Sequence, residues 1–489
     1  MIASNMVGRA LLLVITTSTS SAFAPSFARK SLSINRHISS QSPLWSAVSQ
    51  DTPAQLPEFA SQGDYLEYLE TVSALPSGFA AGSADGTFVS VEAPAMGPLP
   101  IRATIISLTE GPTDSWAAVF TTNRFPGAPI IVGRSRLSEG GPLHALVINN
   151  KVSNVCSGGD GVADSELVCE AVAAALDLPG GSKTVLPSST GVIGWRLPAK
   201  ELANDIVPKA AANMQSDSIL AAASAIMTTD RYPKVRSATL SNGARIVAIG
   251  KGAGMIEPNM ATMLAYILTD ATVPKATLQS MLSDAVNQSF NSISVDGDES
   301  TSDTVAVVAS NQVPLEDEEE FKQALEKVCI GLASDIVRNG EGTAHVMRVE
   351  IANFPGTDLE ARRLGRHIVN SPLFKCAVSG NDPNTGRLAG AIGSYMGKFL
   401  PEAPVDKVSL TLGGRSIFSN GKFVLEGQEV EEELSRHMEN AEYGDSTDYP
   451  PHQKFVEIGV DFGAGSSSAT VLGSDLTNEY IAVNADYRS

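Results

Sequence analysis

Short apolar runs rich in β-branched residues alternate with alanine-rich stretches from about Gly78 onward. β-Branched residues favour strands and Ala favours helices, so each run predicts one kind of element. Strands are expected at residues 146–148, 245–249, 407–412, 417–424, 455–461 and 480–484. Helices are expected at residues 166–178, 216–227, 275–291 and 321–338. This alternation predicts an α/β or α+β enzyme-like chain and gives no sign of a repeat or coiled coil.

The length and charge of the chain restrict its class further. A chain of 489 residues predicts two or three domains at roughly 150 residues each. Acidic residues outnumber basic ones by 54 to 35, which argues against a nucleic-acid partner, because phosphates need a basic surface. No apolar run approaches the roughly 18 residues of a membrane span, so we expect no membrane partner for the mature protein.

Residues 1–50 differ in composition from the rest. They contain four basic residues and no Asp or Glu, with many Ser and Thr. A short apolar run at 10–15 suits a signal-peptide core, and the Ser/Arg-rich stretch after Phe23 suits a transit peptide. This order resembles the bipartite presequences of algae with secondary plastids, which predicts the chloroplast stroma. A secretory signal or a mitochondrial presequence is the alternative. Residues 51–77 are expected to form a linker.

Common catalytic and metal motifs are missing from the sequence. There is no G-x-S-x-G, H-E-x-x-H or phosphate-binding loop, and the four Cys residues form no C-x-x-C pair. Residues 296–307 begin like a calcium loop but lack its Gly and its final Glu. We therefore predict no metal site and interpret the cysteines as buried apolar residues.

Residues 251–265 have an unusual chemistry. They follow an expected strand, contain two Gly, and place the small Ala261 before Thr262 at the head of an apolar run. A Thr freed by cleavage on its N-terminal side carries a hydroxyl and an α-amine on one residue. That amine, with an ordinary pKa of about 8, can act as the general base without any His. From composition alone, Thr262 would be interpreted as just a residue that enters a buried element.

Here the sequence resembles the ornithine acetyltransferase family, the self-cleaving glutamate N-acetyltransferases of the cyclic arginine pathway. The resemblance covers nearly all of residues 78–489. It rests on motifs that match in order, at residues 120–123 with 128–129, 189–194, 226–230, 251–265, 289–298, 339–342, 380–384 and 484–489.

The resemblance implies a role for each matching position. Thr262 matches the nucleophile, with cleavage between Ala261 and Thr262. Thr190 and Gly191 match the oxyanion-hole pair, since a hydroxyl and an N–H can both donate to a tetrahedral intermediate. Positions that match substrate contacts are Thr228, Lys251, Thr262, Glu341, Asn484 and Ser489. Without the ordered match, Glu341 would be interpreted as a turn residue and Lys251 as a surface charge.

The resemblance also implies the fold and the reaction. The expected fold is a layered α/β sandwich with two or more lobes, cut into an α chain at 78–261 and a β chain at 262–489, assembled as a heterotetramer of two α and two β chains. The expected reaction moves an acetyl group from N-acetylornithine to glutamate, giving ornithine and N-acetylglutamate, through an acetyl-Thr262 intermediate. No cofactor is implied, and acetyl-CoA stays open as a second acetyl donor.

The sequence departs from the family pattern at several places. Residues 149–155 replace the usual run before the Cys, Thr385 replaces a Trp, and the last residue is Ser489 instead of Thr. Residues 438–453 are interpreted as an insertion. These departures leave the identity of the acetyl acceptor open. Two alternatives to the transferase also remain: a related N-terminal-nucleophile aminopeptidase or amidohydrolase, in which water replaces glutamate, and a non-catalytic binding protein on the same fold.

Overall fold

The computed structural model describes residues 56–257, 263–443 and 448–486. Three β-sheets carry the described part of the chain, with four, five and seven strands. Mixed strands and helices in layers confirm the predicted α/β class.

The four-stranded sheet has the order β1-β2-β4-β5. Antiparallel pairing joins β1 and β2, from Phe79 opposite Leu108, and parallel pairing joins β4 and β5, from Ala145 opposite Val185. Its strands are β1 (Phe79–Val89), β2 (Pro98–Leu108), β4 (Ala145–Asn149) and β5 (Val185–Ser189). One face is covered by α3 (Gly161–Ala175), α4 (Ala199–Glu201) and α5 (Val207–Ala212).

The five-stranded sheet has the order β3-β10-β8-β7-β6. Its strands are β3 (Trp116–Phe120), β6 (Lys234–Thr239), β7 (Arg245–Lys251), β8 (Leu264–Thr272) and β10 (Thr304–Pro314). Helices α7 (Lys275–Gln288) and α8 (Glu318–Arg338) pack on one face. Parallel pairing sets Leu264 of β8 opposite Thr304 of β10.

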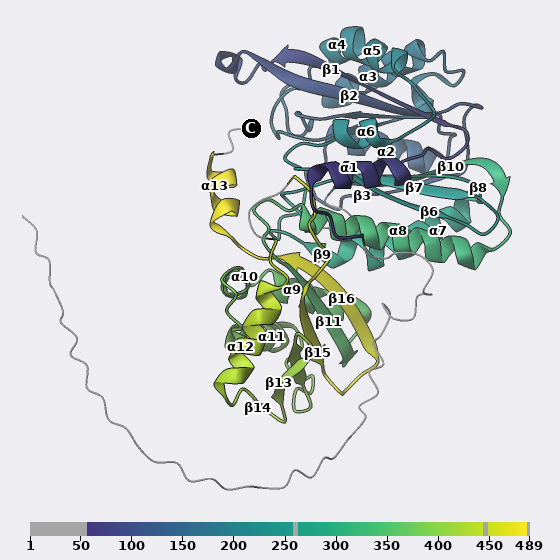
Figure 1. Ribbon diagram of the computed structural model, residues 1–489. Coiled ribbons are helices and arrows are strands. Elements are labelled where there is room, and N and C mark those ends of the chain that lie inside the picture. Colours follow the sequence, from purple (N-terminus) through teal and green to yellow (C-terminus); the bar gives the residue numbers. More distant parts are fainter. Residues whose placement is uncertain (1–55, 258–262, 444–447, 487–489) are drawn as a thin grey trace, which may run out of the picture. The chain divides into compact units, whose positions relative to one another are not determined.

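The two sheets pack face to face through one apolar core. Alternate residues of β4 show this, because Leu146 and Ile148 enter the core between the sheets whereas Ala145 and Val147 face the outer helices. Three further helices contribute at the edges of this core, namely α1 (Gln62–Val72), α2 (Ala128–Glu139) and α6 (Leu220–Ala225). The result is a helix–sheet–sheet–helix sandwich, and Figure 1 shows α3 to α5 and α7 to α8 as its outer layers.

A third, seven-stranded sheet forms a separate core with its own helices. Its order is β14-β13-β12-β15-β11-β16-β9. The strands are β9 (Ile293–Ser294), β11 (Val346–Phe354), β12 (Ser409–Leu412), β13 (Arg415–Ser419), β14 (Lys422–Phe423), β15 (Val456–Asp461) and β16 (Ser467–Ser474). The helices are α9 (Asp358–Val369), α10 (Pro372–Ser379), α11 (Thr385–Phe399) and α12 (Gln428–Glu439).

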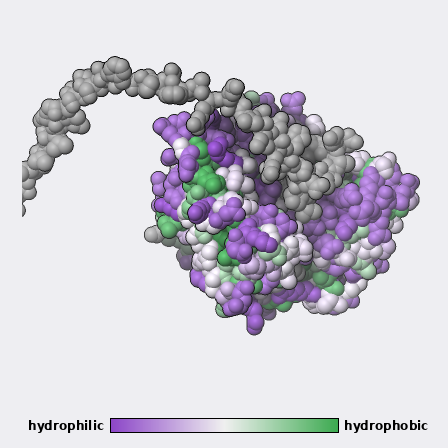
Figure 2. All heavy atoms as spheres, turned by 90° about the horizontal axis from the view of Figure 1, so that it is seen from below, coloured by the Kyte–Doolittle hydropathy of each residue, from purple (hydrophilic) through white to green (hydrophobic). Residues whose placement is uncertain are grey.

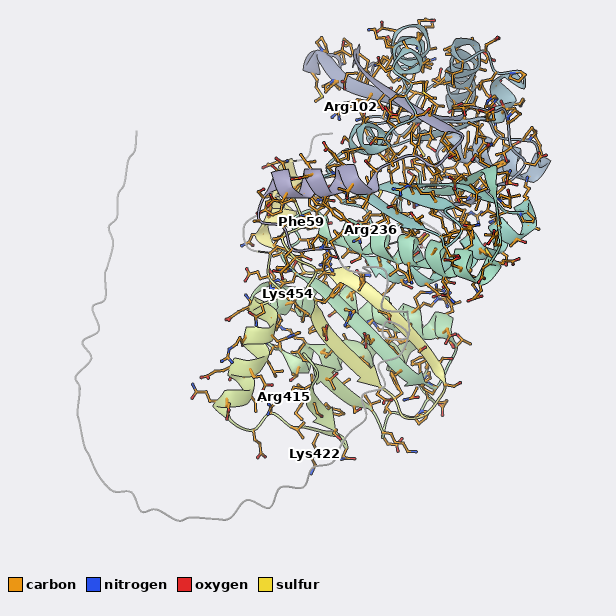
Figure 3. All side chains as sticks on the ribbon, turned by 45° about the vertical axis from the view of Figure 1, so that its right-hand side comes forward. Phe59, Arg102, Arg236, Arg415, Lys422 and Lys454 are labelled. Carbon is orange, nitrogen blue, oxygen red and sulfur yellow. The ribbon has the colours of Figure 1, made fainter. Side chains whose placement is uncertain are left out.

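Buried and exposed ion pairs join distant parts of the chain. Arg236 of β6 donates through Nε and Nη2 to both carboxylate oxygens of Asp335 in α8, at 2.6 and 2.7 Å (Figure 3). Near the surface, the Phe59 N–H donates to the Pro451 carbonyl at 3.2 Å. Lys454, labelled close to Phe59 in Figure 3, pairs with Glu58 at 3.8 Å. The segment before α1 is thereby fastened to the stretch interpreted as an insertion.

Two strand predictions are wrong. Residues 480–484 lie in α13 (Asn478–Asp486), because the Thr477 hydroxyl accepts the Tyr480 N–H at 3.2 Å and so caps a helix. Residues 417–424 are not one strand but two, β13 and β14. Asn420 and Gly421 both take a positive φ between them, which is the geometry of a tight hairpin turn.

The expected linker at 51–77 and two cysteine predictions also fail. Helix α1 occupies part of this range, capped by the Ser61 hydroxyl, and it buries Tyr65 and Leu69 four residues apart on one face. Cys169 and Cys329 are buried as expected, but Cys156 and Cys376 are exposed.

Three of the four predicted helices are confirmed. Those at 166–178, 275–291 and 321–338 correspond to α3, α7 and α8, whereas the one at 216–227 shrinks to α6. No helix in the described ranges is both long and apolar enough to cross a bilayer. The face drawn in Figure 2 is mostly hydrophilic, with apolar side chains in scattered groups.

Candidate active site

One cavity of about 210 Å³ gathers the residues that the sequence had singled out. Its wall contains Thr190, Gly191, Thr228, Lys251, Glu341 and Asn484. These six positions come from segments up to 294 residues apart, between Thr190 and Asn484, so only the fold brings them together. The other three predicted positions, Ala261, Thr262 and Ser489, lie outside the described residues. Met263, which follows Thr262 in the chain, lines the same cavity.

Strand β5 delivers Thr190 and Gly191 to the cavity wall. Thr190 is buried, and its N–H donates to the Asn149 carbonyl at the end of β4. Gly191 has a φ of 127°, and a Cβ there would lie 2.2 Å from the Lys151 carbonyl carbon. The position therefore requires Gly, because both the backbone conformation and the close approach exclude a side chain. A hydroxyl and a backbone N–H next to each other are the donors that an oxyanion needs.

Asp230 fixes the backbone at or next to two predicted substrate positions, Thr228 and Lys251. Its Oδ2 accepts the Thr228 N–H at 3.1 Å, and its Oδ1 accepts the Gly252 N–H at 2.7 Å. The Lys234 ammonium, fully buried, donates to Oδ1 at 2.5 Å. Burial alone would raise the pKa of Asp230, but Lys234 and Lys251 together with the Gly252 N–H lower it to about 2. Asp230 is thus a carboxylate that fixes the backbone on both sides of the cavity.

Lys251 ends β7 and supplies positive charge to the cavity. Burial lowers its pKa from the ordinary value, while the carboxylates of Asp230 and Glu341 act in the opposite direction. An ammonium in such a place attracts the carboxylate of a small anion.

Glu341 and Asn484 form another part of the cavity wall. The Asn484 side-chain amide donates to Oε2 of Glu341 at 3.0 Å, and the Glu341 N–H donates to the Ala253 carbonyl at 2.9 Å. A Cβ on Gly254 would lie 2.4 Å from Oε2 of Glu341, so Gly254 allows the carboxylate to approach. Gly342, with a φ of 63°, gives similar room to the Tyr480 backbone at the start of α13.

The turn that precedes the expected cleavage site is held by a carboxylate. Asp296 accepts the N–H groups of Met255 and Ile256 at 2.7 and 2.8 Å through Oδ2 and Oδ1. Met255 has a φ of 57°, which is uncommon outside Gly. On the other side, the Met263 carbonyl accepts the Thr304 N–H at 3.0 Å. The described residues on both sides of 258–262 are therefore anchored at the cavity.

Sequence reasoning missed three residues of this site. Asp230 and Asp296 lie inside motifs that were noticed, but their roles depend on backbone contacts that no spacing reveals. Asp303 also lines the cavity and was not singled out. It directly precedes the long apolar run that forms β10, and a carboxyl at the head of a buried strand was the available signal. Within the described ranges, no group of three or more His, Cys, Asp or Glu side chains could hold a metal ion.

The fold and the cavity define a small-molecule site whose wall contains the Thr190 hydroxyl, the Gly191 backbone and the Lys251 side chain. The ArgJ family model matches residues 102–489. The chain belongs to the ArgJ family.

The sequence of this chain matches curated relatives over most of their length. The arginine biosynthesis bifunctional protein ArgJ of Nitratidesulfovibrio vulgaris is 36% identical over 425 residues, covering 86% of this chain and all of the relative. The protein of the same name from Methylococcus capsulatus is 38% identical over 395 residues, covering 79% of this chain and 90% of the relative.

Solved structures give shorter matches. The ornithine acetyltransferase of Mycobacterium tuberculosis complexed with ornithine is 34% identical, with a TM-score of 0.34, and the match covers 39% of this chain and 97% of that chain. The ArgJ protein of Bacillus halodurans is 32% identical, with a TM-score of 0.40, and the match covers 46% of this chain and all of that chain.

Proposed function

We propose that this chain transfers the acetyl group of N2-acetyl-L-ornithine to L-glutamate. The observation that carries the proposal is the single cavity that unites Thr190 and Gly191 with Lys251, Glu341 and Asn484. Family membership supports it, since the curated relatives are named as bifunctional proteins of arginine biosynthesis. Lys251 suits the α-carboxylate that acetylornithine and glutamate share.

The proposed mechanism is ping-pong through Thr262. The Thr262 hydroxyl attacks the acetyl carbonyl carbon while the α-amine of the same residue takes its proton. Thr190 and Gly191 donate hydrogen bonds to the oxyanion, the C–N bond breaks, and the departing ornithine amine takes the proton back. The glutamate amine then attacks the acetyl ester, and the reverse proton transfers return Thr262 to its free form.

This mechanism requires cleavage between Ala261 and Thr262. The protein is then expected to run as two chains on a denaturing gel, the smaller spanning Thr262 to Ser489. The Thr262→Ala variant is expected to stay whole and to lose acetyl transfer. Met260→Ala is the matched control, because it changes a neighbouring side chain, keeps the nucleophile and should still be cut. Two fragments from Thr262→Ala would exclude self-cleavage by this residue.

An acetyl-transfer assay with and without glutamate separates the transferase from a hydrolase. Release of ornithine that depends on glutamate supports the transferase, and release of ornithine and acetate without glutamate supports the amidohydrolase. The same assay with acetyl-CoA in place of acetylornithine tests whether acetyl-CoA serves as a second donor. Sedimentation analysis of the cleaved protein tests the proposed assembly of two α and two β chains.

We also propose that residues 1–50 direct the chain to the plastid stroma. Their acid-free composition supports this proposal. A fluorescent protein fused behind residues 1–50 should accumulate in plastids, and accumulation in mitochondria would support the alternative address.

A further inference from the structure

Asp303 is a buried carboxyl in the cavity wall that the mechanism above does not use. The residue is 2% exposed, and it lines the cavity together with Lys251. Its backbone is fixed, because the Asp303 carbonyl accepts the Thr121 N–H at 3.0 Å and the N–H of the next residue, Thr304, donates to the Met263 carbonyl. The Oδ2 atom is buried and has no hydrogen-bond partner.

The surroundings of Asp303 favour the uncharged form of its carboxyl. Its buried Oδ2 atom has no partner among the described residues, and a carboxylate buried without a partner is strongly disfavoured. Burial raises the pKa of Asp303 well above its ordinary value, the Ser300 and Thr121 hydroxyls and Lys251 oppose the shift, and Glu299 adds to it. Lys251 itself interacts electrostatically with Asp230, Lys234 and Glu341. An uncharged carboxyl differs from a carboxylate in one decisive way, since it carries an O–H donor.

We propose that Asp303 is a substrate-binding residue, whose uncharged carboxyl donates a hydrogen bond to the carboxylate of the bound amino acid beside Lys251. One observation and one general principle point to a carboxylate as the partner. Lys251 places positive charge in the same wall, and a donor to an ionised oxygen forms a stronger hydrogen bond than a donor to a neutral one. An ionised Asp303 would instead repel the same ligand. The identity of the ligand as an amino acid rests on the proposed function.

The direction in which a substitution of Asp303 changes the affinity for ornithine distinguishes an uncharged carboxyl from an ionised one. We would measure L-ornithine binding to the full cleaved protein by calorimetry at pH 7. Asp303→Ala removes the donor and is expected to weaken binding about tenfold, the effect of one hydrogen bond to a charged group. Asp303→Asn keeps an N–H donor and is expected to stay within about threefold of the wild type. Unchanged or tighter binding in Asp303→Ala would overturn the proposal.

The pH dependence gives a second readout that a purely structural role would not change. Asp303 donates only while protonated, so wild-type binding should weaken as pH rises through its raised pKa. Asn does not titrate, and Asp303→Asn should lose this part of the alkaline decline and keep the part that belongs to Lys251. Asp298→Asn is the matched control, because burial and Asp296 also raise the pKa of Asp298, but this side chain does not line the cavity. An alkaline decline identical in wild type and Asp303→Asn would overturn the proposal.

The ornithine-binding measurement distinguishes a failure of the proposed function from a failure of the role proposed for Asp303. Wild-type protein that does not bind ornithine would contradict the proposed function and this proposal with it. Wild-type protein that binds ornithine but is indifferent to Asp303→Ala would contradict only the role of Asp303. Equal losses of melting temperature and binding in both Asp303 variants would assign the residue to the fold and not to the substrate.

Discussion

The Oδ1 atom of Asp230 lies 2.7 Å from the Gly252 nitrogen and accepts its N–H. This contact joins the loop after α6, which brings Thr228 to the cavity, to the residue that follows Lys251 at the end of β7. The same carboxylate holds the buried Lys234 ammonium. One side chain therefore links the geometry of the site to the stability of the fold.

Asp230→Asn is expected to lower the free energy of unfolding by about 3 kcal/mol at pH 7, because it leaves the buried Lys234 ammonium without its counter-ion. The Asp230 pKa of about 2 lies below the unfolded value of about 3.9. The carboxylate thus stabilises the fold above about pH 4, and this contribution is lost as pH falls toward 2. Urea unfolding at pH 7 and pH 3 measures both effects. Asp205→Asn breaks an exposed pair with Lys209 and should cost less than about 1 kcal/mol; an equal cost for both would contradict the assignment.

Thr190→Ala is expected to lower kcat about a hundredfold, which corresponds to about 3 kcal/mol for one preorganised oxyanion donor. The KM for acetylornithine should change little, because the donor acts mainly in the transition state. Steady-state kinetics of acetyl transfer measure this. Thr190→Ser keeps the hydroxyl and serves as the control. Wild-type turnover in Thr190→Ala would remove Thr190 from the oxyanion hole.

Gly254→Ala is expected to displace the Glu341 carboxylate, because the new Cβ would lie 2.4 Å from Oε2. Since a carboxylate at the end of a flexible side chain can move, stability should barely change while the KM for acetylornithine rises about tenfold. Gly390→Ala in α11 is the matched control, since nothing lies within 4 Å of its Cβ. A large loss of melting temperature without a change in KM would show that Gly254 matters for folding alone.

Asn484→Ala removes the side-chain amide that donates to Glu341 at 3.0 Å. We expect the KM for acetylornithine to rise about tenfold with little change in melting temperature, because α13 contains no buried residues. Ile481→Ala, on the same helix and 57% exposed, should leave both quantities unchanged. Kinetics of Asn484→Ala that match the wild type would place this helix outside the substrate site.

The sequence predicted the elements whose pattern is local. Residues 146–148 and 245–249 became β4 and β7, and the apolar spacing in 321–338 became α8, because each pattern records which face is buried. The errors came from single contacts that override such patterns. The Thr477 hydroxyl caps a helix at residues 478–486, where a strand was predicted. A tight turn at Asn420 and Gly421 divides residues 417–424 into the two strands of a hairpin.

The residues of the candidate site could not be predicted as a set from local patterns. Thr190, Thr228, Lys251, Glu341 and Asn484 have no common spacing, and only the ordered resemblance to a family predicted them as one set. Asp303 was missed because its burial depends on β3, β8 and β10, strands that come from distant parts of the chain and pair, for example, Trp116 with Val308. The local pattern marks Asp303 only as the residue at the head of an apolar strand, and it cannot encode a pairing of that range.

The position of the expected cut has a consequence for how the protein unfolds. Strand β7 lies before it and β8 after it, and the two are antiparallel neighbours paired from Ile246 opposite Thr269 to Lys251 opposite Leu264. Strand β3, also before the cut, pairs with β10 behind it. A cut chain would therefore be two polypeptides that share one sheet, and neither could complete that sheet alone. Refolding from denaturant would become a second-order reaction that slows on dilution, whereas uncut Thr262→Ala protein would refold at a rate independent of concentration.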